Sequence, residues 1–282
     1  MDEWARLLGK WAYGLLPAGT IPDVVFELAP AGQLPPLPAE PPLFVDPKRI
    51  VNVYQLSNGQ LLLYFLDGAM VQLELNRQGQ QRISGWLTHD LLRHQRFEDV
   101  TFTALAPVLR RRGYYLLHAF GATISGRAVL MVGPSGSGKT TSGLSLVTAG
   151  WQLLANDAVL LEHRPDGIYA LPTPGYLHIR PKTLDLLPQL LHGPLFVWGE
   201  AVQISLICLP QVTGRDNTTF IVQNQAITLA RLMEESLDSW DQTTISAHLN
   251  LRQTLSQQTN SYALLLGKDV ANLPTLIHSV FI

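Results

Sequence analysis

The sequence is poor in cysteine and in charged residues. Cys208 is its one cysteine, which excludes an internal disulfide framework and any metal site built from two or four cysteines. Charged residues make up 15% of the 282 residues, against about 25% in an average soluble chain, which disfavours a highly charged disordered protein and a coiled coil. The formal net charge of −2 is not that of a protein that binds mainly nucleic acid or an anionic membrane.

Long apolar runs are also missing. The runs 61–66 and 262–267 are far shorter than the ~20 residues that a membrane-spanning helix needs. Asp2 and Glu3 stand where a secretory signal carries positive charge. We therefore expect a cytoplasmic protein with neither a membrane nor a nucleic acid as partner. Hydrophobic residues make up 46% of the chain, and the mean hydropathy is +0.13, which indicates a leucine-rich core or a surface covered by a partner, a second copy included.

The first part of the chain predicts a β-rich accessory region over residues 1–112. Residues 34–47 read LPPLPAEPPLFVDP, and proline at this density predicts an extended connector or surface loop. After it, short apolar runs alternate with the turn dipeptides Asn58-Gly59 and Asp67-Gly68. These dipeptides supply the positive φ of tight hairpins, so we expect a four-stranded antiparallel meander over residues 50–87.

A helix is expected over residues 101–112, between the meander and the rest of the chain. Its apolar residues recur at helical spacing, and Gly113 stands where a helix C-cap belongs. Arg110, Arg111 and Arg112 precede that glycine. We expect them to complement the helix C-terminus and to remain solvated.

From Tyr114 onward the pattern changes to strands alternating with helices, which predicts an α/β domain over residues 113–282. Strands are expected at 114–123, 127–132, 152–155, 158–163, 168–171, 203–209 and 261–266, and helices at 140–149, 181–191, 229–237, 243–257 and from 270 onward.

The strongest signal is the segment 133–140, which reads GPSGSGKT and matches G-x-x-x-x-G-K-[ST] in full. Its glycines let the backbone wrap around phosphate oxygens, Lys139 brings a positive charge to the β- and γ-phosphates, and the Thr140 hydroxyl is a natural Mg²⁺ ligand. An apolar run precedes the segment and a helix-forming run follows it, as this motif requires; a glycine-rich turn without a ligand is the alternative. The candidate phosphate-binding residues are Gly133, Ser135, Gly136, Ser137, Gly138, Lys139, Thr140 and Thr141.

Four further side chains are candidates. Asp157 follows the apolar run 153–155, the arrangement in which a strand delivers a carboxylate to Mg²⁺; alone, such an Asp is usually a turn or cap residue. His118 lies within an apolar strand, where a histidine is more often a satisfied core residue. Arg180, with His178 beside it, is a candidate for contact with a phosphate or an acidic substrate; the alternative is an ordinary surface arginine.

With these residues in view, the stretch 116–190 resembles the kinase domain of HPr kinase/phosphorylase and its HPr-kinase-like relatives. The resemblance rests on His118 ahead of the glycine-rich segment, on SGSGKTT, on the dipeptide Asn156-Asp157 after an apolar strand, and on the segment 174–181. It implies a mixed sheet related to that of phosphoenolpyruvate carboxykinase. It also implies ATP and Mg²⁺ as cofactors, and transfer of the γ-phosphate to a serine hydroxyl on a small protein.

Carried over by position, Lys139 and Thr140 would hold phosphate and Mg²⁺, His118 would lie beside the active site, and Asn156-Asp157 would occupy the place of two aspartates. Two residues depart from the family. Asn156 replaces the first aspartate and cannot accept a proton, and Thr141 replaces a glutamate. With an N-terminal region unlike that of the true HPr kinases, these departures indicate a relative, such as one associated with the biosynthesis of ribosomal peptides.

The sequence therefore predicts a kinase that acts on a Ser or Thr hydroxyl of a small protein or a precursor peptide. Its expected catalytic residues are Asp157, Lys139, His118 and Asn156, with Thr140 and Asp157 toward the metal. Two alternatives stay open. One is a nucleotide-binding regulatory or scaffold module without phosphoryl transfer, which Asn156 favours. The other is a small-molecule kinase or a carboxykinase-like enzyme.

Overall fold

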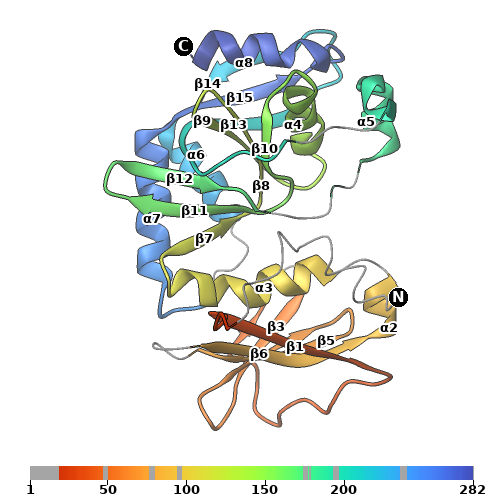
Figure 1. Ribbon diagram of the computed structural model, residues 1–282, viewed down its shortest axis with the longest axis vertical. Coiled ribbons are helices and arrows are strands. Elements are labelled where there is room, and N and C mark those ends of the chain that lie inside the picture. The colour runs from red at the N-terminus through yellow and green to blue at the C-terminus, as the bar shows by residue number, and fades with distance from the viewer. Residues whose placement is uncertain are drawn as a thin grey trace. The chain divides into compact units, whose positions relative to one another are not determined.

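The computed structural model describes residues 19–46, 50–75, 80–93, 97–173, 177, 179–192, 197–235 and 240–281. Contacts between Cα atoms divide the chain into two compact units. One is formed by the described residues of 14–112 with those of 238–245, and the other by the described residues of 113–237 and 246–282. Each unit is described by itself (Figure 1). In the described part of the chain no helix is long and apolar enough to cross a bilayer.

The smaller unit is built on a six-stranded sheet in the order β1-β6-β5-β4-β3-β2. Strands β2 to β6 pair antiparallel in sequence order, whereas β1 returns to pair with β6 in parallel. The strands are β1 (Val24–Ala31), β2 (Phe44–Val45), β3 (Val51–Gln55), β4 (Leu61–Phe65), β5 (Ala69–Glu74) and β6 (Gln81–Thr88).

Both faces of this sheet carry buried apolar side chains. Val53, Leu63 and Val71 lie in register on one face and are fully buried, and helix α3 (Phe97–Arg110) contacts β5. On the other face, Tyr54, Leu62 and Met70 form a cluster that Leu34 of the proline-rich segment also contacts. That segment is largely without regular structure, but it contains the short strand β2, which the sequence did not predict.

Helix α3 begins at Phe97, four residues before the expected start, and ends at Arg110. The expectation that Arg110, Arg111 and Arg112 remain solvated is wrong for the first two. Arg110 and Arg111 both pair with Asp241, and the side chains of Arg110 and Asp241 are 1% and 3% exposed. Two cations around one buried carboxylate compensate the cost of removing its charge from water. A short helix, α2 (His89–Arg93), precedes α3.

The larger unit is built on a second mixed sheet, of nine strands, along the path β10-β8-β9-β13-β12-β11-β7, with β15 beside β13 and β14 beside β15. The three strands β9, β13 and β15 are mutually parallel, and the other pairs are antiparallel. The strands are β7 (Tyr114–Leu117), β8 (Ala119–Ile124), β9 (Arg127–Val132), β10 (Gln152–Ala155), β11 (Val159–Arg164), β12 (Gly167–Leu171), β13 (Val202–Val212), β14 (Thr219–Val222) and β15 (Asn260–Leu266).

Helices cover the two faces of this sheet, and Figure 1 shows α4 and α7 on opposite sides of it. Leu130 and Val132 of β9 point into a cluster that contains residues of α6 and α7, whereas Val129 and Met131 point into a second cluster with α4 and α8. The helices are α4 (Lys139–Thr148), α5 (Pro181–Leu186), the 3₁₀ turn Pro188–His192, α6 (Gln225–Glu234), α7 (Ile245–Gln258), the 3₁₀ turn Val270–Asn272 and α8 (Leu273–Phe281). The fold is therefore mixed α/β.

The strand expected over residues 114–123 is two strands that separate at His118. Strand β7 pairs with β11, whereas β8 pairs with β9 and β10. At the break, the backbone N–H of His118 donates to the carbonyl of Glu235 at 2.9 Å, and that of Ala119 donates to the carbonyl of Asp157 at 3.2 Å. This break brings His118, Asp157 and Glu235 together, although they lie far apart in the sequence.

Candidate functional site

The glycine-rich segment forms the loop between β9 and α4. Strand β9 is buried from Ala128 to Val132, where it ends, and Gly133 follows it. The N–H of Ser137 donates to the carbonyl of Pro134 at 3.1 Å, which closes the loop, and the N–H of Ser142 donates to the carbonyl of Gly138 at 2.9 Å, which begins the helix. The first amides of a helix have no partner within it and carry the positive end of its dipole. The loop therefore lies at a site suited to an anion.

Gly138 is the residue on which this turn depends. Its φ is +105°, in the region that side chains disfavour. A Cβ atom here would lie 2.4 Å from Cδ1 of Leu266 and 3.4 Å from Cγ2 of Val212. The loop thus packs directly against the ends of β15 and β13, and a side chain at this position would have to take a strained backbone and displace the end of Leu266.

Lys139 lies across the loop with its side chain almost buried, at 6% exposed for the residue. Its Nζ donates to the carbonyls of Gly133 at 2.5 Å and Pro134 at 3.2 Å, and lies 3.0 Å from Nε2 of His118. Burial lowers the pKa of Lys139, the charges of Glu235 and then Asp157 oppose this, and Arg180 lowers the pKa further. The ammonium is therefore fixed at the loop, with its charge balanced between neighbours of both signs.

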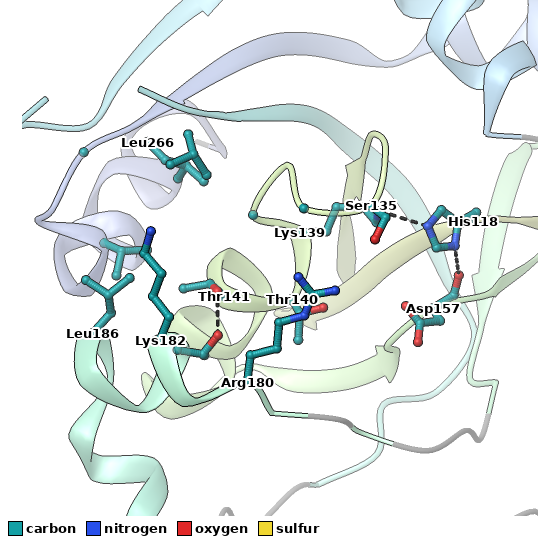
Figure 2. A pocket seen from close by; sticks show the side chains of 16 residues that line it. His118, Ser135, Lys139, Thr140, Thr141, Asp157, Arg180, Lys182, Leu186 and Leu266 are labelled. Carbon is teal, nitrogen blue, oxygen red and sulfur yellow. Dashed lines mark hydrogen bonds between the residues drawn. The ribbon is translucent and has the colours of Figure 1, made fainter. Parts of the chain in front are cut away.

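His118 links this lysine to the next strand. Its Nδ1 lies 3.0 Å from the carbonyl oxygen of Asp157. A carbonyl can only accept, so Nδ1 carries the proton, and the neutral ring then presents Nε2 as an acceptor to the ammonium of Lys139. Figure 2 shows both interactions. His118 is thus a wall of the site and not a residue of the apolar core.

A chain of polar side chains joins the first turn of α4 to the end of β10. The Thr140 hydroxyl donates to Oδ1 of Asn156 at 3.4 Å, and Nδ2 of Asn156 donates to Oδ2 of Asp157 at 3.2 Å. The amide can accept on one side and donate on the other, which a carboxylate cannot do. Oxygens of a hydroxyl, an amide and a carboxylate are the ligands that Mg²⁺ prefers, usually together with substrate phosphates, so this group of residues fits such an ion.

These residues surround one pocket of about 360 Å³. His118 and Asp157 lie at one end of it, Lys139, Thr140 and Thr141 in the middle, and Leu266 and Leu186 at the other end (Figure 2). The volume falls within the range of small-ligand pockets. The lining residues are His118, Ser135, Gly136, Gly138, Lys139, Thr140, Thr141, Asp157, Arg180, Lys182, Thr183, Leu186, Val212, Leu266, Gly267 and Val270.

Most candidates from the sequence share this pocket, and their roles in binding stay predictions. Gly133, Ser137 and Asn156 lie behind the wall: Gly133 accepts from Lys139, Ser137 closes the loop, and Asn156 bridges Thr140 and Asp157. His178 lies outside the described residues.

Several residues that belong to the site or affect it were not predicted from the sequence, and three of them are polar or charged. Lys182 and Thr183 lie on α5, and the hydroxyl of Thr183 lies 2.9 Å from that of Thr141. Glu235 is nearly buried at the end of α6, where its carbonyl holds His118. Lys182 and Thr183 follow Arg180-Pro181, which marks a helix start, but Glu235 follows an ordinary amphipathic helix and nothing in its local pattern distinguishes it.

No protein-family model matches the chain, and no curated protein matches it. Among solved structures, the HPr(Ser) kinase/phosphatase from Coxiella burnetii is similar, with a TM-score of 0.32 and 16% sequence identity. The superposition covers 58% of this chain and 92% of the other. At that score and identity, the similarity establishes neither a family nor an activity.

Proposed function

We propose that this chain is an ATP- and Mg²⁺-dependent kinase that transfers the γ-phosphate to a Ser or Thr hydroxyl of a small protein or a ribosomal precursor peptide. One observation carries the proposal. A buried ammonium, Lys139, lies across a glycine-rich loop, and the two ends of an oxygen-rich chain, Thr140 and Asp157, line the same pocket. A cation, loop amides and metal-type oxygens are the three parts that phosphoryl transfer from a nucleotide requires.

The loop would bind the phosphates. The amides of the first turn of α4 and the ammonium of Lys139 would offset the negative charge of the β- and γ-phosphates. A phosphate oxygen would compete with the carbonyls of Gly133 and Pro134 for that ammonium, while His118 keeps its position from the other side. Thr140 and Asp157 would hold Mg²⁺, which when bound neutralises charge on the transferred group.

Asp157 would also orient the acceptor hydroxyl. Its place at the end of the pocket beside His118 is where the hydroxyl of an incoming Ser or Thr would meet the γ-phosphate. Asn156, held between Thr140 and Asp157, would fix the direction of that carboxylate. The transition state of phosphoryl transfer is loose and asks little of a base, so one carboxylate is enough. Arg180, which lines the pocket, and His178 would contact the acceptor.

A nucleotide-binding module without transfer is the second candidate, and Asn156 is the observation that favours it. Asn156 stands where the HPr-kinase-like proteins that the sequence resembles have an aspartate. Its amide also makes hydrogen bonds on both sides, to Thr140 and to Asp157. Such a module would bind ATP with the same loop and leave the phosphate in place. Measurement of binding and of transfer on one sample separates the two candidates.

The test is incubation with γ-labelled ATP, Mg²⁺ and candidate acceptors, taken first from small proteins and peptides encoded beside this chain. Lys139→Ala should lower transfer by about a hundredfold or more, because it removes a positioned charge from the transition state. Lys268→Ala is the matched control, since Lys268 is an exposed lysine that pairs with Asp216 at the surface. Absence of transfer to every acceptor, or equal transfer by Lys139→Ala and the wild type, would contradict the kinase.

A further inference from the structure

The end of the pocket away from His118 and Asp157 carries four apolar side chains, with Lys182 of α5 beside them. Val212 is the last residue of β13 and Leu266 is the last residue of β15. Leu186 of α5 and Val270 line the pocket beside them. Figure 2 shows Leu266 and Leu186 across the pocket from His118 and Asp157, with the residues of the loop between them. We propose that this apolar end is the nucleobase subsite, an inference that rests on the proposed binding of a nucleoside triphosphate at the loop.

The direction of the bound nucleotide follows from the chemistry of transfer. The attacking and the leaving oxygen lie roughly in line across the transferred phosphoryl group. If the acceptor hydroxyl is at Asp157, the leaving nucleoside diphosphate extends to the opposite side of Lys139. That side of the pocket is the one that Leu186, Val212 and Leu266 line.

Two of these four side chains are open to an apolar ligand, whereas Leu266 and Val270 are buried. Val212 is 58% exposed although it is apolar, and Leu186 is half-buried. Val212 and Leu266 also contact the position of Gly138, so a surface that a base could cover begins next to the phosphate loop. A flat ring placed there would remove apolar area from water on both sides of the contact, which favours binding.

The backbone at this end is already committed to internal hydrogen bonds. The N–H of Gly267 donates to the hydroxyl of Thr218 at 3.0 Å, and the carbonyl of Leu266 accepts from the N–H and the hydroxyl of Thr213 at 3.1 and 2.9 Å. These bonds fix the wall in position and occupy these two backbone groups. The contribution of this end is therefore burial of the base faces, and the loop supplies the charge contacts.

The experiment compares a ligand that has a base with one that has none. Calorimetry measures the Kd of ATP and of inorganic tripolyphosphate, both with Mg²⁺, for the wild type and for Val212→Trp, whose ring would fill the space over β13. The Kd of ATP should rise about tenfold or more, because the new ring takes the place in which the base would be buried. The Kd of tripolyphosphate, which has no base, should not change. Val222→Trp is the control, because Val222 is 76% exposed on β14 and does not line the pocket.

A second variant, Leu186→Ala, removes apolar surface without filling the pocket. It should also raise the Kd of ATP and leave the Kd of tripolyphosphate unchanged. Melting curves establish whether both variants are folded. An equal rise in the Kd of both ligands in Val212→Trp, or no rise in either, would overturn the subsite. Binding of tripolyphosphate but not of ATP by the wild type would overturn it too, and would leave the phosphate loop standing. Absence of binding of either ligand to the wild type would instead refute the proposed function, and the subsite with it.

Discussion

Substitution of Gly138 by alanine tests the geometry of the loop through the free energy of unfolding, whose change can be worked out from the structure. The backbone there has a φ of +105°, and the new Cβ would lie 2.4 Å from Cδ1 of Leu266. Gly136 in the same loop is the matched control. Its φ is +84°, and a Cβ there would meet nothing within 4 Å. The two substitutions share the cost of the backbone and differ in the contact.

The expected magnitudes follow from these two terms. A left-handed backbone costs a non-glycine residue about 1–2 kcal/mol, and this term applies to Gly136→Ala and to Gly138→Ala. Forcing an extra carbon into a packed site costs about 1–3 kcal/mol more, and this term applies to Gly138→Ala alone. The free energy of unfolding should therefore fall by about 1–2 kcal/mol in Gly136→Ala and by about 2–5 kcal/mol in Gly138→Ala.

Urea unfolding gives these free energies, and a double-mutant cycle with Leu266→Ala isolates the contact. Leu266→Ala is destabilising by itself, but the cycle subtracts that effect. The remaining coupling between positions 138 and 266 should be about 1–3 kcal/mol in the direction of relief, because the shorter side chain makes room for the new Cβ. A Gly138→Ala variant no less stable than Gly136→Ala, or a coupling near zero, would refute the packing of the loop against Leu266.

Three further predictions concern the charges of the site. Asn156→Asp places a second carboxylate beside Asp157 and removes the amide donor between them, so transfer by a kinase should change modestly; appearance of transfer where the wild type has none would instead favour the scaffold module. Burial lowers the pKa of Lys139, and the charged form of this lysine is the one that binds phosphate. The affinity for ATP should therefore be full below the lowered pKa and should fall as the pH rises through it. This fall should come at a lower pH than that at which an ordinary lysine titrates. Glu235 raises the pKa of Lys139, so Glu235→Gln should move this fall to lower pH; an unchanged profile or a shift to higher pH would contradict the assignment.

Local patterns were enough to predict the elements that carry the loop. The run 127–132 is β9, and the helix expected from residue 140 is α4, which begins at Lys139. Both follow from an apolar run, a glycine-rich turn and a helix-forming run in succession, which are properties of neighbouring residues. The turn dipeptides of the smaller unit work in the same way, and β3 to β6 follow one another as hairpins.

Long-range pairings could not be predicted in this way. Strand β1 lies beside β6 in parallel, a pairing that no turn encodes because the two strands lie far apart in the sequence. The break at His118 has the same origin, since the partners of its neighbouring amides are the carbonyls of Glu235 and Asp157, far along the chain. Glu235 was missed for this reason: its effect on Lys139 exists only once α6 has packed on the sheet.

The most direct test of the account is a crystal structure of this chain with a non-hydrolysable ATP analogue and Mg²⁺. The account predicts phosphate density against the amides of residues 135–140, with Nζ of Lys139 in contact with it and the metal beside Thr140 and Asp157. The base should lie on the side of Val212 and Leu266. A loop without nucleotide at saturating concentration, or a nucleotide held elsewhere on the chain, would contradict it.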